Sequence, residues 1–263
     1  MIIWYSGQNK KEAKTNKPNQ KKIMKIGILL VGRATDDLVE KYGTYAEMLI
    51  SLINSKEEVF EFKTFNILDS VFPKNHLECD GWIVTGSPHG VYEEHSWIPT
   101  VSQLINDIYQ ASLPIFGVCF GHQLIAQALG GHVEKSIKGW GLGLHTYEIN
   151  NKTDYMGNLP KELTLNICHQ DQVLQVPEGA KVYAKSDFCE NAGFYIKDKV
   201  LTMQAHPEFL VDFIEALLTA RRDLTIPKEF VDPALSKLKA EPDSVQSSQF
   251  AETIRQFFLR IVY

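Results

Sequence analysis

Three short, continuous apolar runs limit the folds that this chain can adopt. They are Ile26–Val31, Gly81–Thr85 and Leu113–Val118. Runs that are apolar throughout their length are typical of strands buried on both faces of a sheet. Between them, apolar residues recur at helical spacing in Tyr45–Ile53 and Trp97–Ile108. Strands that alternate with helices predict an α/β fold, in which a largely parallel sheet is covered on both faces.

The second half of the chain has a different pattern. Residues 139–205 form short strand-like segments separated by turns, which predict antiparallel pairing. Residues 222–248 are rich in Lys, Pro and Ser, and we interpret them as a surface connection that can include a short helix. The remaining expected elements are a strand over 59–65, a helix from Phe120 or Gly121 towards Gly130, and helices around 213–218 and 250–261.

The N-terminal segment differs from the rest of the chain. Residues 6–22 are polar, rich in Lys and Asn, and lack apolar periodicity. Such a segment cannot bury enough apolar surface to offset its ordering entropy. We therefore predict a disordered arm over residues 1–23, and one domain over residues 24–263 that ends in a helical extension.

Composition excludes several classes of function. The net charge is −5, and no basic stretch follows the N-terminal segment, so nucleic acid is not expected as a main partner. No apolar run approaches the roughly 18 residues that cross a bilayer. The four cysteines form no CxxC pair and lack zinc spacing, which predicts free thiols, no metal site and a cytoplasmic location. They are Cys79, Cys119, Cys168 and Cys189.

The strongest chemical signal is Gly117-Val118-Cys119-Phe120-Gly121-His122-Gln123, where an apolar strand gives way to a helix. A nucleophile on such a sharp turn has a strained backbone and needs small neighbours, which the two flanking glycines provide. The start of the helix favours a thiolate and supplies N–H groups for an oxyanion. The pattern therefore predicts that Cys119 is a nucleophile and not a core cysteine.

A thiol nucleophile needs a base, and the base needs an orienting group. His206-Pro207-Glu208 directly follows the apolar strand expected over residues 200–205. A parallel sheet can bring the end of this strand beside Cys119. We therefore expect His206 to carry the proton and Glu208 to hold the imidazole.

These two motifs together resemble the class I (triad) glutamine amidotransferases, over roughly residues 25 to 220. The resemblance implies a flavodoxin-like fold with an open, mixed, mainly parallel sheet. It also implies that Cys119 forms a γ-glutamyl thioester and releases ammonia or an amine. In this family pattern His206 acts as general base and then as acid, and Glu208 orients it. No cofactor is implied.

The resemblance extends to the residues that bind the substrate. Thr85–Gly90 matches the family's oxyanion strand, which implies backbone N–H donors at Gly86 or Ser87 and at Phe120. Gln123 matches the residue that contacts the amino-acid end of the substrate. Cys168–Asp171 matches a loop over the α-amino and α-carboxylate groups, which makes His169, Gln170 and Asp171 substrate-binding candidates.

Four local patterns look like the stand-alone, GMP-synthase-like group that includes the cytosolic γ-glutamyl peptidases. They are Tyr42-Gly43-x-Tyr45, Ser87-Pro88-His89, the His-Gln-Asp-x-Val of 169–173, and Glu241-Pro242-Asp243. Neither nucleotide-binding pattern, GxGxxG or GxxxxGK[ST], occurs where a strand precedes a helix. The chain is therefore expected either to hydrolyse small γ-glutamyl compounds itself or to deliver ammonia to a separate synthetase partner. No oligomeric state follows from these patterns.

Two other classes of protein could have a similar fold. A catalytically silent binding protein would be expected to have lost a member of the triad, and here all three are present. Another type of cysteine hydrolase would use a histidine close behind the nucleophile, such as His122. We interpret Glu93, Glu94 and Trp140 as surface-loop residues, although such loops can line the leaving-group side of a site.

Overall fold

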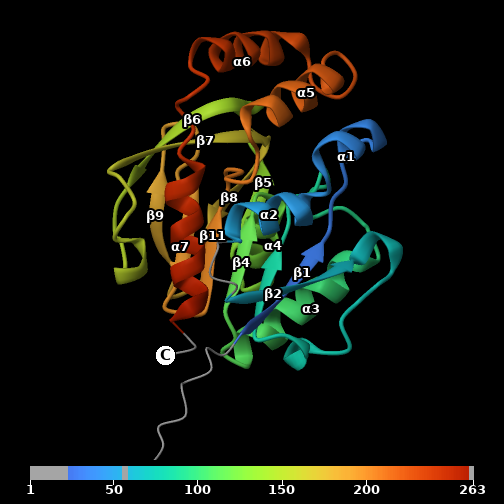
Figure 1. Cartoon of the computed structure of the whole chain (residues 1–263), viewed down its shortest axis with the longest axis vertical. Coiled ribbons are helices and arrows are strands. Elements are labelled where there is room, and N and C mark those ends of the chain that lie inside the picture. The colour runs from blue at the N-terminus through green and yellow to red at the C-terminus, as the bar shows by residue number, and fades with distance from the viewer. Residues whose placement is uncertain (1–22, 55–58, 261–263) are drawn as a thin grey trace, which may run out of the picture.

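The computed structural model describes residues 23–54 and 59–260. The predicted disordered arm, apart from Ile23, lies outside the described residues. Within them, nine strands form one sheet in the order β2-β1-β3-β4-β11-β10-β9-β6-β7, and two more strands, β5 and β8, pair separately (Figure 1). The strands are β1 (Met24–Leu30), β2 (Phe60–Asn66), β3 (Gly81–Val84), β4 (Ile115–Val118), β5 (His132–Lys135), β6 (Gly141–Ile149), β7 (Glu162–His169), β8 (Asp171–Gln175), β9 (Lys181–Lys185), β10 (Gly193–Ile196) and β11 (Val200–Met203).

The sheet has a parallel and an antiparallel half. Strands β2, β1, β3, β4 and β11 run parallel to one another, whereas β10, β9, β6 and β7 continue the sheet from β11 with antiparallel pairing. All residues of β3, β4 and β11 are buried, which explains their continuous apolar sequence. The predicted open, mixed sheet with a parallel core is confirmed.

Helices cover both faces of the parallel half (Figure 1). On one face, Leu49 of α2 and Ile254 of α7 belong to the larger hydrophobic core. On the other face, Ile105 of α3 and Leu124 of α4 belong to a second core. The helices are α1 (Asp36–Tyr42), α2 (Tyr45–Ile53), α3 (Trp97–Gln110), α4 (Phe120–Ala128), α5 (Val211–Arg221), α6 (Lys228–Ala240) and α7 (Ser247–Leu259).

The segment 222–248 is more ordered than the sequence indicated. It contains the 13-residue helix α6, which packs on β6 and buries Val231, Ala234 and Leu238. The Lys237 ammonium donates to the Leu144 carbonyl of β6 at 3.0 Å. The sequence interpretation underestimated the length of this helix because its apolar stripe is narrow and is interspersed with Lys, Asp and Pro.

The topology brings three segments together at the carboxyl ends of β3, β4 and β11. Gly86 follows β3, Cys119 follows β4 and His206 follows β11. Ligands bind at this edge of open α/β sheets. His206 also forms an isolated antiparallel bridge with Asn166 of β7, in which the backbone N–H of His206 donates to the Asn166 carbonyl at 2.8 Å.

Two sequence-level expectations can be compared directly with this structure. Over residues 23–54 and 59–260, no helix is both long and apolar enough to cross a membrane. All four cysteines are buried and free, as the sequence predicted.

Candidate functional site

Cys119 occupies the turn between β4 and α4 with a strained backbone. Its φ is 51° and its ψ is −105°, and its N–H donates to the Met203 carbonyl of β11 at 2.9 Å. A residue other than glycine adopts such a positive φ only when the surrounding structure imposes it. The strain lies at the residue that the sequence singled out as a nucleophile.

The two glycines around Cys119 make this turn sterically possible. A Cβ atom on Gly121 would lie 2.2 Å from the Val84 carbonyl oxygen, and one on Gly117 would lie 2.5 Å from the Gly121 carbonyl oxygen. These neighbours are backbone atoms that cannot rotate away. The strand, the turn and the helix can therefore pack this closely only with glycine at both positions.

His206 and Glu208 form a buried pair beside this turn. Glu208 Oε1 accepts a hydrogen bond from His206 Nδ1 at 2.8 Å, and both residues are only 4% exposed. Burial by itself lowers the pKa of His206. Negative charge at Cys119 and Glu208, and hydrogen bonds to both, outweigh burial and raise that pKa above its usual value. The site therefore stabilises an imidazolium next to the Cys119 sulfur.

The loop after β3 completes the surroundings of this pair. A Cβ atom on Gly86 would lie 2.8 Å from Cε1 of His206 and 3.7 Å from Cβ of Cys119. The position therefore leaves no room for a side chain. Ser87 lines the pocket next to Cys119, and Phe120 is the first residue of α4. The structure thus brings the three expected oxyanion residues close to the Cys119 turn.

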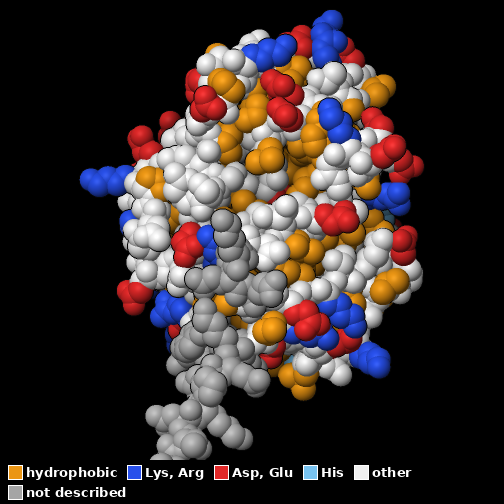
Figure 2. Space-filling view, in the orientation of Figure 1, with side chains coloured by type: hydrophobic (Ala, Val, Ile, Leu, Met, Phe, Trp, Pro, Cys, Tyr) orange, Lys and Arg blue, Asp and Glu red, His pale blue; other side chains and the backbone are white. Residues whose placement is uncertain are grey.

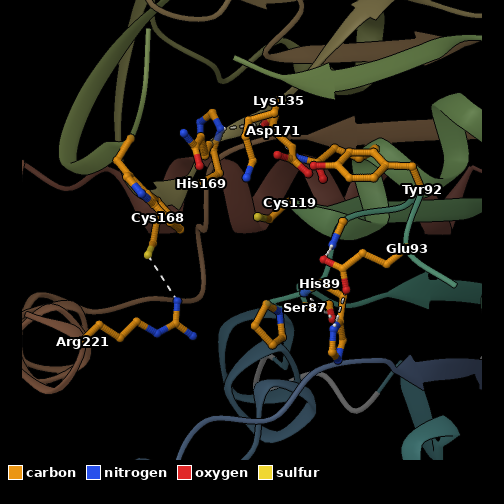
Figure 3. A pocket seen from close by; sticks show the side chains of 15 residues that line it. Ser87, His89, Tyr92, Glu93, Cys119, Lys135, Cys168, His169, Asp171 and Arg221 are labelled. Atoms are coloured by element: carbon orange, nitrogen blue, oxygen red, sulfur yellow. Dashed lines mark hydrogen bonds and ion pairs between the residues drawn. The ribbon is translucent and has the colours of Figure 1, made fainter. Parts of the chain in front are cut away.

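A pocket of about 170 Å³ opens beside Cys119 (Figure 3). Its walls come from the loop after β3, from β5 and the loop that follows it, from the turn between β7 and β8, and from the end of α5. The lining residues are Ser87, Pro88, His89, Gly90, Tyr92, Glu93, Cys119, Gln123, Lys135, Trp140, Cys168, His169, Gln170, Asp171 and Arg221.

The four substrate-binding candidates all line this pocket. Gln123 Nε2 and His169 Nδ1 both donate to the Asp171 carbonyl, at 2.8 and 3.0 Å, and so fix the turn between β7 and β8. Burial lowers the pKa of His169 to about 3, so this ring is neutral. Burial raises the pKa of the Asp171 carboxyl, and a hydrogen bond from Tyr92 and the charge of Lys135 oppose that change.

Several pocket residues did not emerge as site candidates from the sequence. Tyr92, Lys135 and Arg221 were not singled out, and Glu93 and Trp140 were interpreted as surface-loop residues although both line the pocket. Lys135 and Arg221 lie at the ends of β5 and α5, and no local motif marks them. A Cβ on Gly90 would lie 2.9 Å from the Tyr92 ring, so the glycine leaves the space that this ring occupies.

His122, the other candidate base, points into the core. It is fully buried, its Nδ1 lies 2.9 Å from the Thr202 hydroxyl, and its ring packs against Phe194 with a centroid distance of 5.2 Å. Burial lowers its pKa to about 3. Its position in the core argues against the alternative in which His122 serves Cys119.

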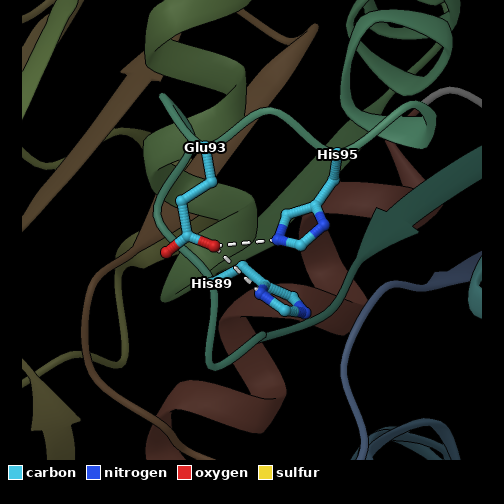
Figure 4. Close-up of side chains that lie close together, drawn as sticks. All are labelled: His89, Glu93 and His95. Carbon is cyan, nitrogen blue, oxygen red and sulfur yellow. Dashed lines mark hydrogen bonds and ion pairs between the residues drawn. The ribbon is translucent and has the colours of Figure 1, made fainter.

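One group of side chains in the described part of the chain has the composition of a metal site. The ligand atoms of His89, Glu93 and His95 lie within 4.8 Å of one another (Figure 4). Glu93 Oε2 already accepts hydrogen bonds from His89 Nδ1 at 3.1 Å and from His95 Nε2 at 2.8 Å. Its other oxygen accepts from the Gly90 N–H at 2.8 Å. These bonds cross-link the loop that forms one wall of the pocket.

Comparison with known proteins agrees with this geometry. Residues 38–213 match the family model described as glutamine amidotransferase class-I. Gamma-glutamyl peptidase 3 of Arabidopsis thaliana is 30% identical over 231 residues, which cover 82% of this chain and 91% of that protein. Gamma-glutamyl peptidase 4 of the same plant is 35% identical over 188 residues, which cover 67% of this chain and 74% of that protein.

More distant matches extend the comparison. The GMP synthase of Finegoldia magna is 30% identical over 215 residues, which cover 77% of this chain but only 40% of that enzyme. A glutamine amidotransferase from Thermotoga maritima has the same fold, with a TM-score of 0.71 at 20% identity over 91% of this chain and 98% of that one. Because the family model covers more than half of the chain, including β2, β3, β4 and β11 with Cys119 and His206, this chain belongs to the class I glutamine amidotransferases.

Proposed function

We propose that this chain hydrolyses γ-glutamyl amide bonds through a covalent thioester on Cys119. The observation that supports this most directly is the strained Cys119 turn, which faces an open pocket and adjoins the buried His206–Glu208 pair. The names of its relatives, which include gamma-glutamyl peptidases, agree with this substrate class.

In the proposed first step, the Cys119 thiolate attacks the γ-carbonyl carbon and forms a C–S bond. The C–N bond then breaks, and His206 gives its Nε2 proton to the departing amine. In the second step, His206 accepts a proton from water, the water oxygen attacks the thioester, and glutamate leaves as the C–S bond breaks. Glu208 holds the Nδ1–H and stabilises the imidazolium in both steps.

The oxyanion that forms in each step needs preorganised donors. We assign this role to backbone N–H groups of Gly86 or Ser87 and of Phe120, because these residues surround the Cys119 turn. One such donor typically contributes about 3 kcal/mol of transition-state stabilisation. The α4 N-terminus adds its partial positive charge at the same place.

The glutamyl end of the substrate is assigned to the turn between β7 and β8. Gln123, His169, Gln170 and Asp171 line the pocket there, and the Asp171 carboxylate is suited to an α-ammonium group. Lys135 lies on the same wall and is suited to the α-carboxylate. A zwitterionic head group would thus meet one charge of each sign.

A second candidate is a glutaminase subunit that delivers ammonia to a separate synthetase chain. The match to GMP synthase supports it, because that enzyme contains a region similar to this chain and is much longer. The two functions share the thioester chemistry. They differ in whether the chain is active alone and in whether the leaving group is a peptide or ammonia.

The purified chain should therefore be incubated alone with glutathione and with glutamine, with Cys119→Ala as the blank. Glutamate, ammonia and the released dipeptide should be followed together. Release of dipeptide and glutamate by the unmodified chain only would support the peptidase. Slow cleavage of glutamine alone would favour the ammonia-delivering subunit. Cleavage of neither compound would contradict hydrolysis of these substrates by the chain alone.

A further inference from the structure

Arg221 is a pocket residue that has no carboxylate partner among the described residues. It ends α5 and lines the same pocket as Cys119 (Figure 3). Its Nη1 donates to the Cys168 sulfur at 3.6 Å. This sulfur is a weak acceptor, because burial raises the pKa of the Cys168 thiol and keeps it neutral. Across residues 23–54 and 59–260, no carboxylate forms an ion pair with Arg221, whereas its neighbour Arg222 contacts both oxygens of Asp232.

A guanidinium in this position has unused binding capacity. Arginine presents five N–H donors in a planar fork that matches a carboxylate. A mostly buried cation that meets only a thiol loses hydration without an ionic partner in return. The backbone of Arg221 is held in place, because its carbonyl accepts hydrogen bonds from the N–H groups of Leu224, Thr225 and Ile226. The pocket is therefore prepared for an anionic group of the substrate.

The position of Arg221 indicates which part of the substrate carries that anion. Figure 3 shows Arg221 and Cys168 on one side of Cys119, and Lys135 and Asp171 on the other. The side with Lys135 and Asp171 is assigned to the glutamyl head group. Arg221 instead shares a small cavity with His206, the proposed proton donor to the departing nitrogen. A leaving group protonated by His206 would extend towards Arg221.

We propose that Arg221 binds a carboxylate of the leaving group. The preferred substrates are then γ-glutamyl compounds of an amino acid or a short peptide, not glutamine or γ-glutamyl derivatives of simple amines. This inference rests on the proposed function and adds a residue that selects among γ-glutamyl compounds. Arg221 acts by binding and takes no part in proton transfer.

Matched substrates test this directly. The full chain, Arg221→Gln, Arg221→Lys and the control Arg222→Gln should be assayed with γ-glutamylalanine, γ-glutamylalaninamide and glutamine. The unmodified chain and Arg222→Gln should prefer the acid to its amide by about tenfold or more in kcat/KM, as a charge-assisted hydrogen bond predicts. Arg221→Gln should lose this preference mainly through KM, with glutamine cleavage changed less than about twofold, and Arg221→Lys should keep part of it.

Two results would overturn the proposal. One is equal cleavage of the acid and the amide by the unmodified chain. The other is an equal loss for all three substrates in Arg221→Gln that retains its thermal midpoint, which would place Arg221 at the glutamyl head group.

Calorimetric binding to Cys119→Ala separates this proposal from the proposed function. The binding of γ-glutamylalanine and of its amide is measured with and without Arg221→Gln, independently of turnover. Tighter binding of the acid that depends on Arg221 would support the carboxylate site even if the unmodified chain cleaved neither compound. Equal binding of the acid and the amide would reject the site even if cleavage occurred.

Discussion

The imidazole of His206 lies flat against the ring of Phe209, with the ring centroids 3.8 Å apart and the planes inclined by only 4°. Glu208 fixes one edge of the imidazole through Nδ1, and Phe209 covers one of its faces. The Phe209 carbonyl in turn accepts a hydrogen bond from Asn166 Nδ2 at 2.9 Å. The orientation of the proposed base is thus set by a hydrogen bond, by a ring contact and by an anchor on β7.

Replacement of Phe209 by Leu is expected to impair the proposed base without unfolding the chain. The smaller side chain leaves one face of the imidazole unsupported, so kcat on a γ-glutamyl substrate should fall about tenfold, a fraction of the full contribution of a general base. Phe213→Leu is the matched control, since its ring contacts Phe209 at 4.6 Å and not His206. Equal kcat in both variants would contradict this role for Phe209.

The backbone strain at Cys119 should appear as a stability difference between two inactive variants. Alanine keeps the positive φ penalty, whereas glycine adopts this conformation readily. Cys119→Gly should therefore be more stable than Cys119→Ala by about 1 kcal/mol in urea unfolding, although glycine usually lowers stability. If Cys119→Gly were the less stable variant, the strain at this turn would be refuted.

Replacement of Gly121 by Ala should disrupt the junction of β3, β4 and α4. The new methyl group would lie 2.2 Å from a backbone oxygen of Val84, so one of these elements must shift. We expect a loss of about 3 kcal/mol in unfolding free energy, at the upper end for overpacking, together with loss of activity. Gly157→Ala is the control, because the nearest atom to its Cβ is the Asp154 carbonyl oxygen at 3.3 Å. A stable, active Gly121→Ala protein would contradict the packing argument.

Acid should destabilise the chain partly through His122. Burial lowers the pKa of His122 to about 3, so it is neutral in the folded state, whereas in the unfolded chain it titrates near its usual value of roughly 6.5. Between these values the unfolded state binds one more proton, and stability falls as pH falls, by about 1.4 kcal/mol per pH unit. Its contribution is complete above the unfolded pKa.

Urea unfolding between pH 4.5 and 6 measures this slope. His122→Phe should reduce it by about 1.4 kcal/mol per pH unit. His206 does not interfere in this range. Its folded pKa is raised, so its contribution is complete below the unfolded pKa and is lost only as pH rises through the folded value. An unchanged slope in His122→Phe would show that this ring is not kept neutral by burial.

The sequence predicted the parallel half of the sheet and the Cys119–His206–Glu208 arrangement for the same physical reason. Buried parallel strands leave a continuous apolar signature, and their carboxyl ends meet at one edge, so residues that follow β4 and β11 could lie close together. The structure shows that these two strands are neighbours. The same argument could not exclude His122 as the base. Residues three apart on a helix lie on the same face, so the spacing alone allowed His122 to lie beside Cys119.

Other parts of the site left no comparable signal. The position of Arg221 depends on how the end of α5 meets the end of β7, where Arg221 contacts Cys168, a residue far away in the sequence. Lys135 reaches the pocket because β5 pairs with β8 outside the main sheet. Helix α6 was underestimated because its buried stripe is narrow and its mean hydropathy is low. In each case packing between distant segments, and not local sequence, determined the outcome.

The bridge between Asn166 and His206 has a further consequence for the antiparallel half of the sheet. It joins β7, a terminal strand, to the chain that leaves β11, so the strands from β11 through β7 curl back into a nearly closed ring. The bridge and the hydrogen bonds between Thr164 and Gln246 occupy polar backbone groups of an edge strand that would otherwise be available to another chain. Closure of this ring both discourages edge-to-edge aggregation and makes the position of His206 depend on the register of β7, since a slip of one residue would displace its anchor.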